Sequence, residues 1–243
     1  MERTEFKSHI SEKYNQNLED LFSLVLEMGG LVESQLGNTL KAVKGEDKSL
    51  AKEVKQVDKI VNKEELEIDR ICATVLARQQ PAASDLRLIV SAIRLAVDLE
   101  RIGDEVVNVS KLAVKMSAVS DVASKALPGY KELIDILSIN IEMLKNVLTG
   151  FAKLDLKEFV DIVEDEQRIS EINELALQEI KNSLNESQNI DAEYLMQMIY
   201  SIRSAERIAA HIVNMGESIV YLVNGDNVRN LKPEKLSQFL KDL

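Results

Sequence analysis

Two acidic residues one helical turn apart are the first candidates for chemistry in this sequence. Glu100 and Asp104 lie within the stretch 79–111, QQPAASDLRLIVSAIRLAVDLERIGDEVVNVSK. At about 100° per residue, Glu100 falls among the apolar positions of a predicted helix and Asp104 at their border, so the two carboxyl groups project side by side. Burying an unpaired carboxylate is costly, so the pair needs a cation, a basic partner, a bound proton or access to water.

A second copy of this helix lies further along the chain. Residues 195–214, LMQMIYSIRSAERIAAHIVN, align with residues 89–108 at a shift of 106 positions, which pairs Glu100 with Glu206 and Arg101 with Arg207. The sequence is therefore a tandem repeat. His211 stands at the position of Glu105, and we expect it at the protein surface.

A polar strip runs along one side of the first copy. It consists of Arg87, Ser91, Arg94, Asp98, Arg101 and Glu105. Two interpretations are open: an ordinary solvated helix face, or a docking strip for a partner protein.

The spacing of apolar residues predicts six long helices. We expect them over about 9–44, from Asp47 to a stop at Pro81, from near Asp85 to about 117, over 130–151, from a capping box at Asp155 and Glu158 to about 185, and from Asp191 to Gly225. Pro and Asp mark the starts and stops because Pro lacks the backbone donor and Asp accepts from free N–H groups.

These helices predict an all-α fold of two tandem antiparallel three-helix bundles. The first domain is expected at 9–117 and the second at 128–225, with a tail over 226–243 that forms a loosely packed short helix or is partly disordered. With only three Pro, nine Gly, 4% aromatic residues and no Trp, the composition argues against a β-sandwich or barrel.

The charge and cysteine content narrow the function. A net charge of −11 without a basic run disfavours direct binding to DNA or RNA. The single cysteine, Cys72, has helical spacing from Ile68 and Val75 and is expected in the core of a protein from a reducing compartment. No apolar stretch approaches the roughly 18 residues of a membrane span, and the N-terminal residues lack an apolar signal segment, so we expect a cytoplasmic protein.

Familiar catalytic sites have no support in the sequence. A ferritin-like di-iron centre would need two Glu-x-x-His pairs, and the only histidines, His9 and His211, do not follow a Glu at that spacing. The sequence also shows no nucleophile–base pair, phosphate loop or dinucleotide fingerprint. We therefore expect no enzyme activity.

Four segments resemble the PhoU family: LARQQPAASDLRLIVSAI, DLERIGDEVVN, SAERI at 204–208 and LEMGGLVESQL at 26–36. The resemblance extends over about 9–230. It implies a bacterial accessory protein of phosphate transport that links the phosphate ABC transporter ATPase to its sensor histidine kinase and holds phosphate-starvation signalling off. It also implies a homodimer that binds no nucleic acid and meets the membrane only through its partners.

The family's metal motif is an acid followed four positions later by Asp, on the second and third helices of each bundle. Carried over by position, the motif is complete only at Glu100 and Asp104. Its companion reads Asp58 and Asn62, while Glu166 is followed by Ser170 and Glu206 by Ala210. The resemblance thus implies a divalent or iron-type metal ion at the first bundle, held by Asp58, Asn62, Glu100 and Asp104, with Glu166 and Glu206 as a weaker second site.

Alternatives remain open for these acids. Glu100 could pair with an Arg or Lys of a neighbouring helix or subunit, and Glu206 could pair with Arg203 one turn earlier. A different class of function, metal storage or a metal-dependent carboxylate site, would need intact acid clusters in both bundles.

Overall fold

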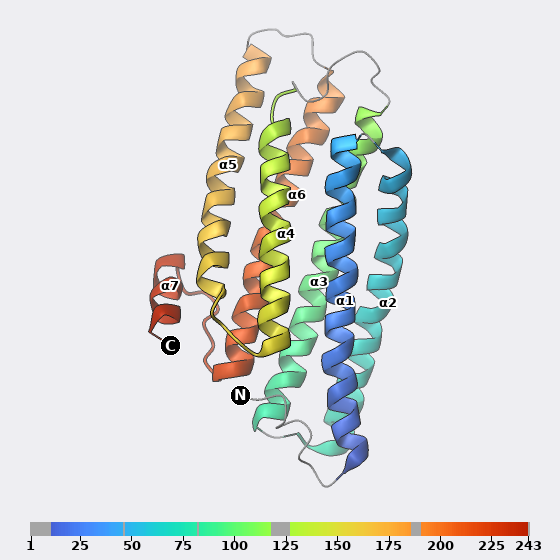
Figure 1. Ribbon diagram of the computed structural model, residues 1–243, viewed down its shortest axis with the longest axis vertical. Helices are drawn as coiled ribbons and strands as arrows, with labels where there is room; N and C mark the ends of the chain where they lie inside the picture. Colours follow the sequence, from blue (N-terminus) through green and yellow to red (C-terminus); the bar gives the residue numbers. More distant parts are fainter. Residues whose placement is uncertain (1–10, 46, 82, 118–126, 186–190, 243) are drawn as a thin grey trace.

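Helices form all the regular structure in the part of the chain that the structure describes (Figure 1). The computed structural model describes residues 11–45, 47–81, 83–117, 127–185 and 191–242. The helices are α1 Glu12–Gly45, α2 Lys48–Gln79, α3 Ala83–Met116, α4 Tyr130–Lys153, α5 Phe159–Asn185, α6 Ala192–Asn224 and α7 Pro233–Lys241. The predicted all-α class is confirmed.

Local signals in the sequence set several helix ends. The Asp47 carboxylate accepts from the backbone N–H groups of Ser49 and Leu50, at 2.9 and 3.0 Å, and starts α2. Gln80 adopts a left-handed conformation with φ of 46° and precedes Pro81, which ends α2 as predicted. At the end of α6, Gly225 has φ of 90°, a conformation that Gly adopts most readily.

Two predicted starts need correction. The third helix begins at Ala83, slightly before the expected Asp85. The capping box at Asp155 and Glu158 is not formed, because the Asp155 carboxylate accepts from the N–H of Lys157 at 3.1 Å and α5 begins only at Phe159. Asp155 thus shapes the turn before the helix.

Each half of the chain packs as a three-helix bundle (Figure 1). Helices α1, α2 and α3 contact one another, as do α4, α5 and α6, and the halves meet where α3 packs on α6 and α1 on α4. The start of the first predicted domain and most of its boundary with the second lie outside the described residues.

Small and aromatic residues bring α1 close to α4. The rings of Phe22 and Phe151 stack with centroids 4.5 Å apart. A Cβ added at Gly29 would lie 2.4 Å from Cδ2 of Leu148, so a larger residue would force the Leu148 side chain to move. Cys72 is fully buried, in agreement with its predicted core role.

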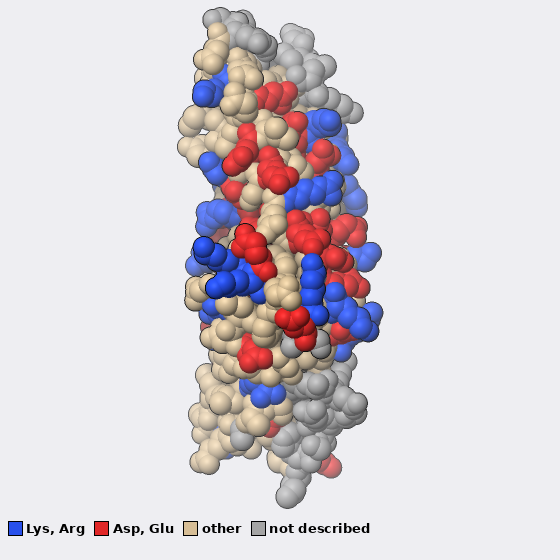
Figure 2. All heavy atoms as spheres, turned by 90° about the vertical axis from the view of Figure 1, so that its left-hand side faces the viewer, with Lys and Arg blue, Asp and Glu red and all other residues tan. Residues whose placement is uncertain are grey.

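The C-terminal segment is a short helix packed on α5. Leu236 and Leu240 of α7 are buried, and Lys241 lies 3.7 Å from Glu164. Around α5, acidic side chains recur along the surface and basic ones flank them (Figure 2). Among the described residues, we find no helix whose length and apolar content would let it cross a membrane.

Candidate functional site

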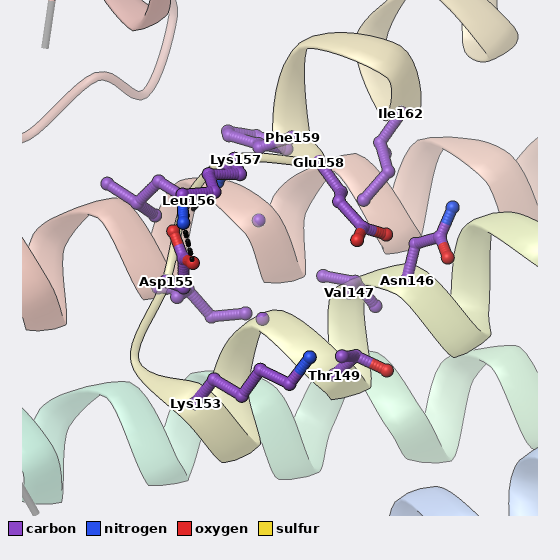
Figure 3. A pocket seen from close by; sticks show the side chains of 13 residues that line it. Asn146, Val147, Thr149, Lys153, Asp155, Leu156, Lys157, Glu158, Phe159 and Ile162 are labelled. Carbon is purple, nitrogen blue, oxygen red and sulfur yellow. Dashed lines mark hydrogen bonds and ion pairs between the residues drawn. The ribbon is translucent and has the colours of Figure 1, made fainter.

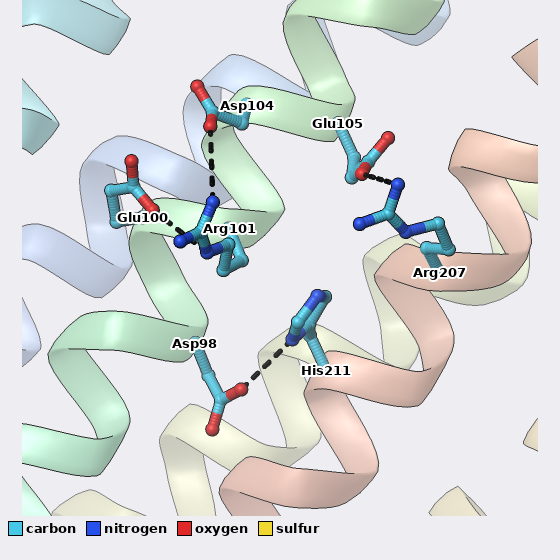
Figure 4. A network of polar contacts seen from close by, with 7 residues as sticks. All are labelled: Asp98, Glu100, Arg101, Asp104, Glu105, Arg207 and His211. Atoms are coloured by element: carbon cyan, nitrogen blue, oxygen red, sulfur yellow. Dashed lines mark hydrogen bonds and ion pairs between the residues drawn. The ribbon is translucent and has the colours of Figure 1, made fainter.

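The predicted acid pair lies on α3, with a basic residue between its two members (Figure 4). The Arg101 guanidinium is 3.6 Å from Glu100 through Nε and 3.9 Å from Asp104 through Nη1. The Glu100 side chain is 17% exposed and that of Asp104 47% exposed. Glu100 therefore has a basic neighbour on its own helix, where the sequence suggested one on another helix or subunit.

Acids of α2 face this pair. Burial raises the pKa of Glu100, the negative charge of Asp104 raises it further and Arg101 opposes the rise, with smaller contributions from Glu65 and Asp58. Burial also raises the pKa of Asp58, where Gln35 opposes the effect and Asp104 adds to it. These carboxylates thus form one mutually repelling group on the α2–α3 face.

Glu65 belongs to this group, although sequence reasoning missed it. Its pKa is raised by burial first, then by Asp69 and Asp104. Glu65 follows Asp58 by seven positions, which places both on the same side of a helix. That spacing was the signal available in the sequence.

The arrangement does not form a ready metal site. In the described ranges, no three His, Cys, Asp or Glu side chains are placed to hold one ion. Gln35 lies 3.5 Å from Asp58, and Asn62 has a buried amide oxygen that no described group bonds. The Arg101 guanidinium would have to move before an ion could contact both Glu100 and Asp104.

In the second bundle, where the acid motif has lost two of its four carboxylates, the structure brings together the remaining two, Glu166 and Glu206. Burial raises the pKa of Glu166, and the charge of Glu206 raises it further. Arg203 bonds Glu206 at 3.0 Å, the pairing that the sequence offered as an alternative to metal binding. Ser170 and Ala210 supply no carboxylate here.

The polar strip of α3 is neither a solvated face nor an external docking strip, because much of it packs on α6. Ser91 donates to the carbonyl of Ser218 at 3.1 Å, and Arg87 donates to that of Leu222 at 3.1 Å. Arg94 lies over the ring of Tyr221, 5.2 Å from its centroid. For most of the strip both interpretations drawn from the sequence were wrong, since it serves the contact between the two bundles. Arg101 is the exception, because its side chain is 56% exposed.

Two side-chain contacts cross the interface of α3 with α6, which we call the seam (Figure 4). Nδ1 of His211 lies 2.9 Å from Oδ1 of Asp98, so His211 is half-buried and not at the surface as expected. Nη1 of Arg207 lies 2.8 Å from Oε1 of Glu105, whose side chain is only 7% exposed. The repeated helix is therefore the element that joins the halves.

A pocket of about 160 Å³ opens in the second bundle beside the turn between α4 and α5 (Figure 3). The end of α4, the turn before α5, and α6 line it. Its floor is apolar where the Phe159 ring presses on Gly216. Lys153 and Lys157 at its rim are balanced by Asp155 and Glu158, and Lys157 pairs with Asp155 at 3.3 Å.

The sequence also matches a protein-family model, the PhoU domain, over residues 25–113 and again over 133–219. The chain belongs to the PhoU family. The two matches reflect the tandem repeat, since each covers most of one three-helix bundle. The last helix in each matched region is one of the two that form the seam, α3 in the first match and α6 in the second.

PhoU-family proteins of known name resemble this chain over nearly its full length. A Pseudomonas aeruginosa protein named phosphate-specific transport system accessory protein PhoU homolog is 36% identical, with 92% of this chain and 90% of that protein covered. The Escherichia coli protein named phosphate-specific transport system accessory protein PhoU is 32% identical, with 99% and 97% covered.

Solved PhoU structures share the fold. The crystal structure of PhoU from Pseudomonas aeruginosa aligns with a TM-score of 0.81 at 35% identity, covering 88% of this chain and 100% of that one. The phosphate transport system regulatory protein PhoU from Streptococcus pneumoniae aligns with a TM-score of 0.78 at 26% identity, covering 88% and 98%.

Proposed function

We propose that this protein is a cytoplasmic accessory regulator of phosphate-specific transport that acts as an adaptor and not as an enzyme. In this proposal it contacts the ATPase of the phosphate ABC transporter and the sensor histidine kinase, and it holds phosphate-starvation signalling off when phosphate is ample. The observation that carries the proposal is the match, over at least 90% of both chains, to proteins named as phosphate transport accessory proteins.

The chemistry of the described residues supports an adaptor. The acids of α2 and α3 are placed beside Arg101, and Asp98 and Glu105 of the strip are engaged across the seam, so neither group presents a nucleophile with its base. The long helix faces instead provide a large surface on which partner proteins can bind. A net charge of −11 favours protein partners over DNA.

Genetics tests the regulatory part. We expect deletion of the gene to leave phosphate-starvation genes switched on in phosphate-rich medium, and a second deletion of the sensor kinase gene to switch them off again. A transcriptional reporter in the single and double deletion strains provides the measurement. Normal repression in the single deletion strain would overturn the proposal.

Binding assays test the adaptor part. The purified protein should bind the purified kinase or the transporter ATPase and should leave promoter DNA unbound at physiological salt. Specific binding to the promoter of a starvation gene would show a direct repressor instead. A protein that represses normally but binds neither kinase nor ATPase would overturn the adaptor role.

A homodimer is part of the same proposal. Ile60 and Leu66 are exposed apolar residues on α2, at 47% and 67%. They project in directions about 120° apart, so a second copy would cover both only by packing over a broad surface of α2. Light scattering at micromolar concentration should then give twice the mass of one chain. A strict monomer would exclude the dimer while leaving the adaptor proposal intact.

A further inference from the structure

The seam between the two bundles contains an open cleft of about 290 Å³. Helix α3 contributes Glu105, Asn108 and Lys111 to its lining, and α6 contributes Gln197, Arg203 and Arg207 among others. We call it the α3–α6 cleft. Because α3 belongs to the first bundle and α6 to the second, both halves of the chain are needed to form the cleft.

The lining of the α3–α6 cleft is basic in a strongly acidic protein. Lys111, Arg203 and Arg207 face a single carboxylate, that of Glu105. Arg207 holds this carboxylate at 2.8 Å, and Arg203 bonds Glu206, which lies outside the lining. In a chain of net charge −11, such a local excess of positive charge marks a place where a small anion is attracted instead of repelled.

The cations keep donors for a ligand. Among the described residues, the Lys111 ammonium donates to Asn108 at 2.7 Å, and Nη1 of each arginine contacts one glutamate. A lysine carries three N–H donors and an arginine five, so most remain unused. The planar fork of arginine fits the oxygens of a phosphate group particularly well, because two parallel N–H groups can bond two of them.

The other end of the seam shows that the cleft is a specialised feature. At the shift of 106 positions, Lys111 corresponds to Glu217 and Arg203 to Val97. Glu217 is buried, and the same end is filled by Arg94 against Tyr221. Two basic residues of the cleft therefore have no counterpart in the other repeat.

We propose that the α3–α6 cleft binds the phosphate group of a small ligand, either inorganic phosphate or a phosphomonoester. The cleft is larger than one phosphate ion needs. Tyr200, which lines it and is 57% exposed, is an aromatic residue on which an attached base or sugar would pack in this proposal. A ligand there would contact both repeats and so stabilise the packing of α3 on α6.

This inference goes beyond the proposed function and does not depend on it, because binding is measured on the purified full chain without transporter or kinase. Isothermal titration with inorganic phosphate, adenosine monophosphate and adenosine distinguishes the two ligand sources. Binding of phosphate itself identifies the free ion, and binding of the monophosphate alone identifies a phosphomonoester. Adenosine, which lacks the phosphate, should not bind.

A matched pair of double variants tests the site. K111Q/R203Q removes two exposed cations from the cleft, and we expect a loss of affinity of roughly tenfold or more. K63Q/R70Q removes two exposed cations from α2, including an arginine that also bonds a glutamate three positions away, and should bind within about twofold of the unchanged protein.

Three results would overturn the proposal: no binding of either phosphate ligand at roughly 10 mM, equal weakening in both double variants, or unchanged affinity in K111Q/R203Q. Circular dichroism confirms the fold of each variant. Should K111Q/R203Q not fold, Arg203→Lys decides, because it keeps the charge and removes the fork. A weaker affinity then supports the cleft, and an unchanged one counts against it.

Discussion

His211 of α6 bonds Asp98 of α3, with 2.9 Å between Nδ1 and Oδ1, across the seam that joins the two repeats. The side chains are only 20% and 14% exposed. The helices α3 and α6 are repeats of one another, but Asp98 corresponds to Ser204 and His211 to Glu105. The repeat therefore does not contain this Asp–His pair a second time. It is one of several side-chain contacts that hold α3 on α6.

Removing this contact should weaken the whole fold. We expect His211→Ala to lower the free energy of unfolding by about 1 to 2 kcal/mol, because Asp98 loses a bonding partner in a half-buried setting. Urea denaturation at neutral pH measures the change. Arg70→Ala, which breaks an exposed ion pair with Glu67, should change it clearly less, because solvent screens that pair. Equal losses in the two variants would contradict the importance of the seam contact.

The acid group on α2 and α3 predicts a pH dependence of stability. Burial and Asp104 raise the pKa of Glu100 in the folded protein, so its contribution to stability is fully present below the unfolded pKa of about 4.3 and is lost as pH rises through the folded pKa. Glu100→Gln should therefore raise the melting temperature near pH 7 and leave it unchanged near pH 4.

An exposed acid provides the control for this experiment. Arg70 lowers the pKa of Glu67, so the contribution of Glu67 is present above its unfolded pKa and is lost as pH falls through the folded value. Glu67→Gln should not raise the melting temperature at pH 7. A rise of the same size in both variants would mean that the effect of Glu100→Gln is a general response to net charge.

Metal analysis tests the acids as ligands. We expect any metal found in protein purified without chelator to be lost in E100A/D104A and retained in E166A/E206A, because only the first bundle keeps a complete acid pair. Arg101→Ala should increase the affinity, since it removes the cation that lies between the two carboxylates. Metal carried by the second bundle instead would contradict the assignment.

The variant E100A/D104A should also keep its fold. Removing two repelling carboxylates and adding a good helix former has little net effect, whereas Leu99→Ala removes a fully buried side chain and should cost about 2 to 5 kcal/mol. Thermal unfolding compares the two variants. A larger loss in E100A/D104A would show that the acids hold α2 to α3.

Two helical glycines should respond in opposite directions to alanine. A Cβ at Gly216 would lie 1.9 Å from the ring of Phe159, so Gly216→Ala should destabilise the fold by about 1 to 3 kcal/mol. A Cβ at Gly30 would meet nothing within 4 Å, so Gly30→Ala should stabilise the fold by about 0.5 to 1 kcal/mol. Chemical denaturation measures both, and a stabilising Gly216→Ala would refute the close packing.

Signals that act within a few residues were readable from the sequence. Asp47 as a cap, Pro81 as a stop and Gly225 as an end depend on backbone groups close by, and the structure has them where expected. The start of α5 was misjudged because Asp155 finds a different backbone donor, two positions on. Periodicity alone does not choose between these partners.

The polar strip was misjudged for a different reason. Helical spacing shows which residues share a face but not what covers that face, and the covering residues lie more than 100 positions away, as Asp98 and His211 do. The α3–α6 cleft was missed for the same reason. Lys111 and Arg203 become neighbours only when the two repeats pack together.

The packing of α3 on α6 also bears on how such a chain could arise. A protein with only one repeat would leave its third helix uncovered and could cover it by pairing with a second copy of itself. Joining both copies in one polypeptide makes that pairing independent of protein concentration. It also frees the two halves of the seam to diverge, since a symmetric pair must repeat every contact. Here Arg94 packs on Tyr221 toward one end, and basic residues line an opening toward the other.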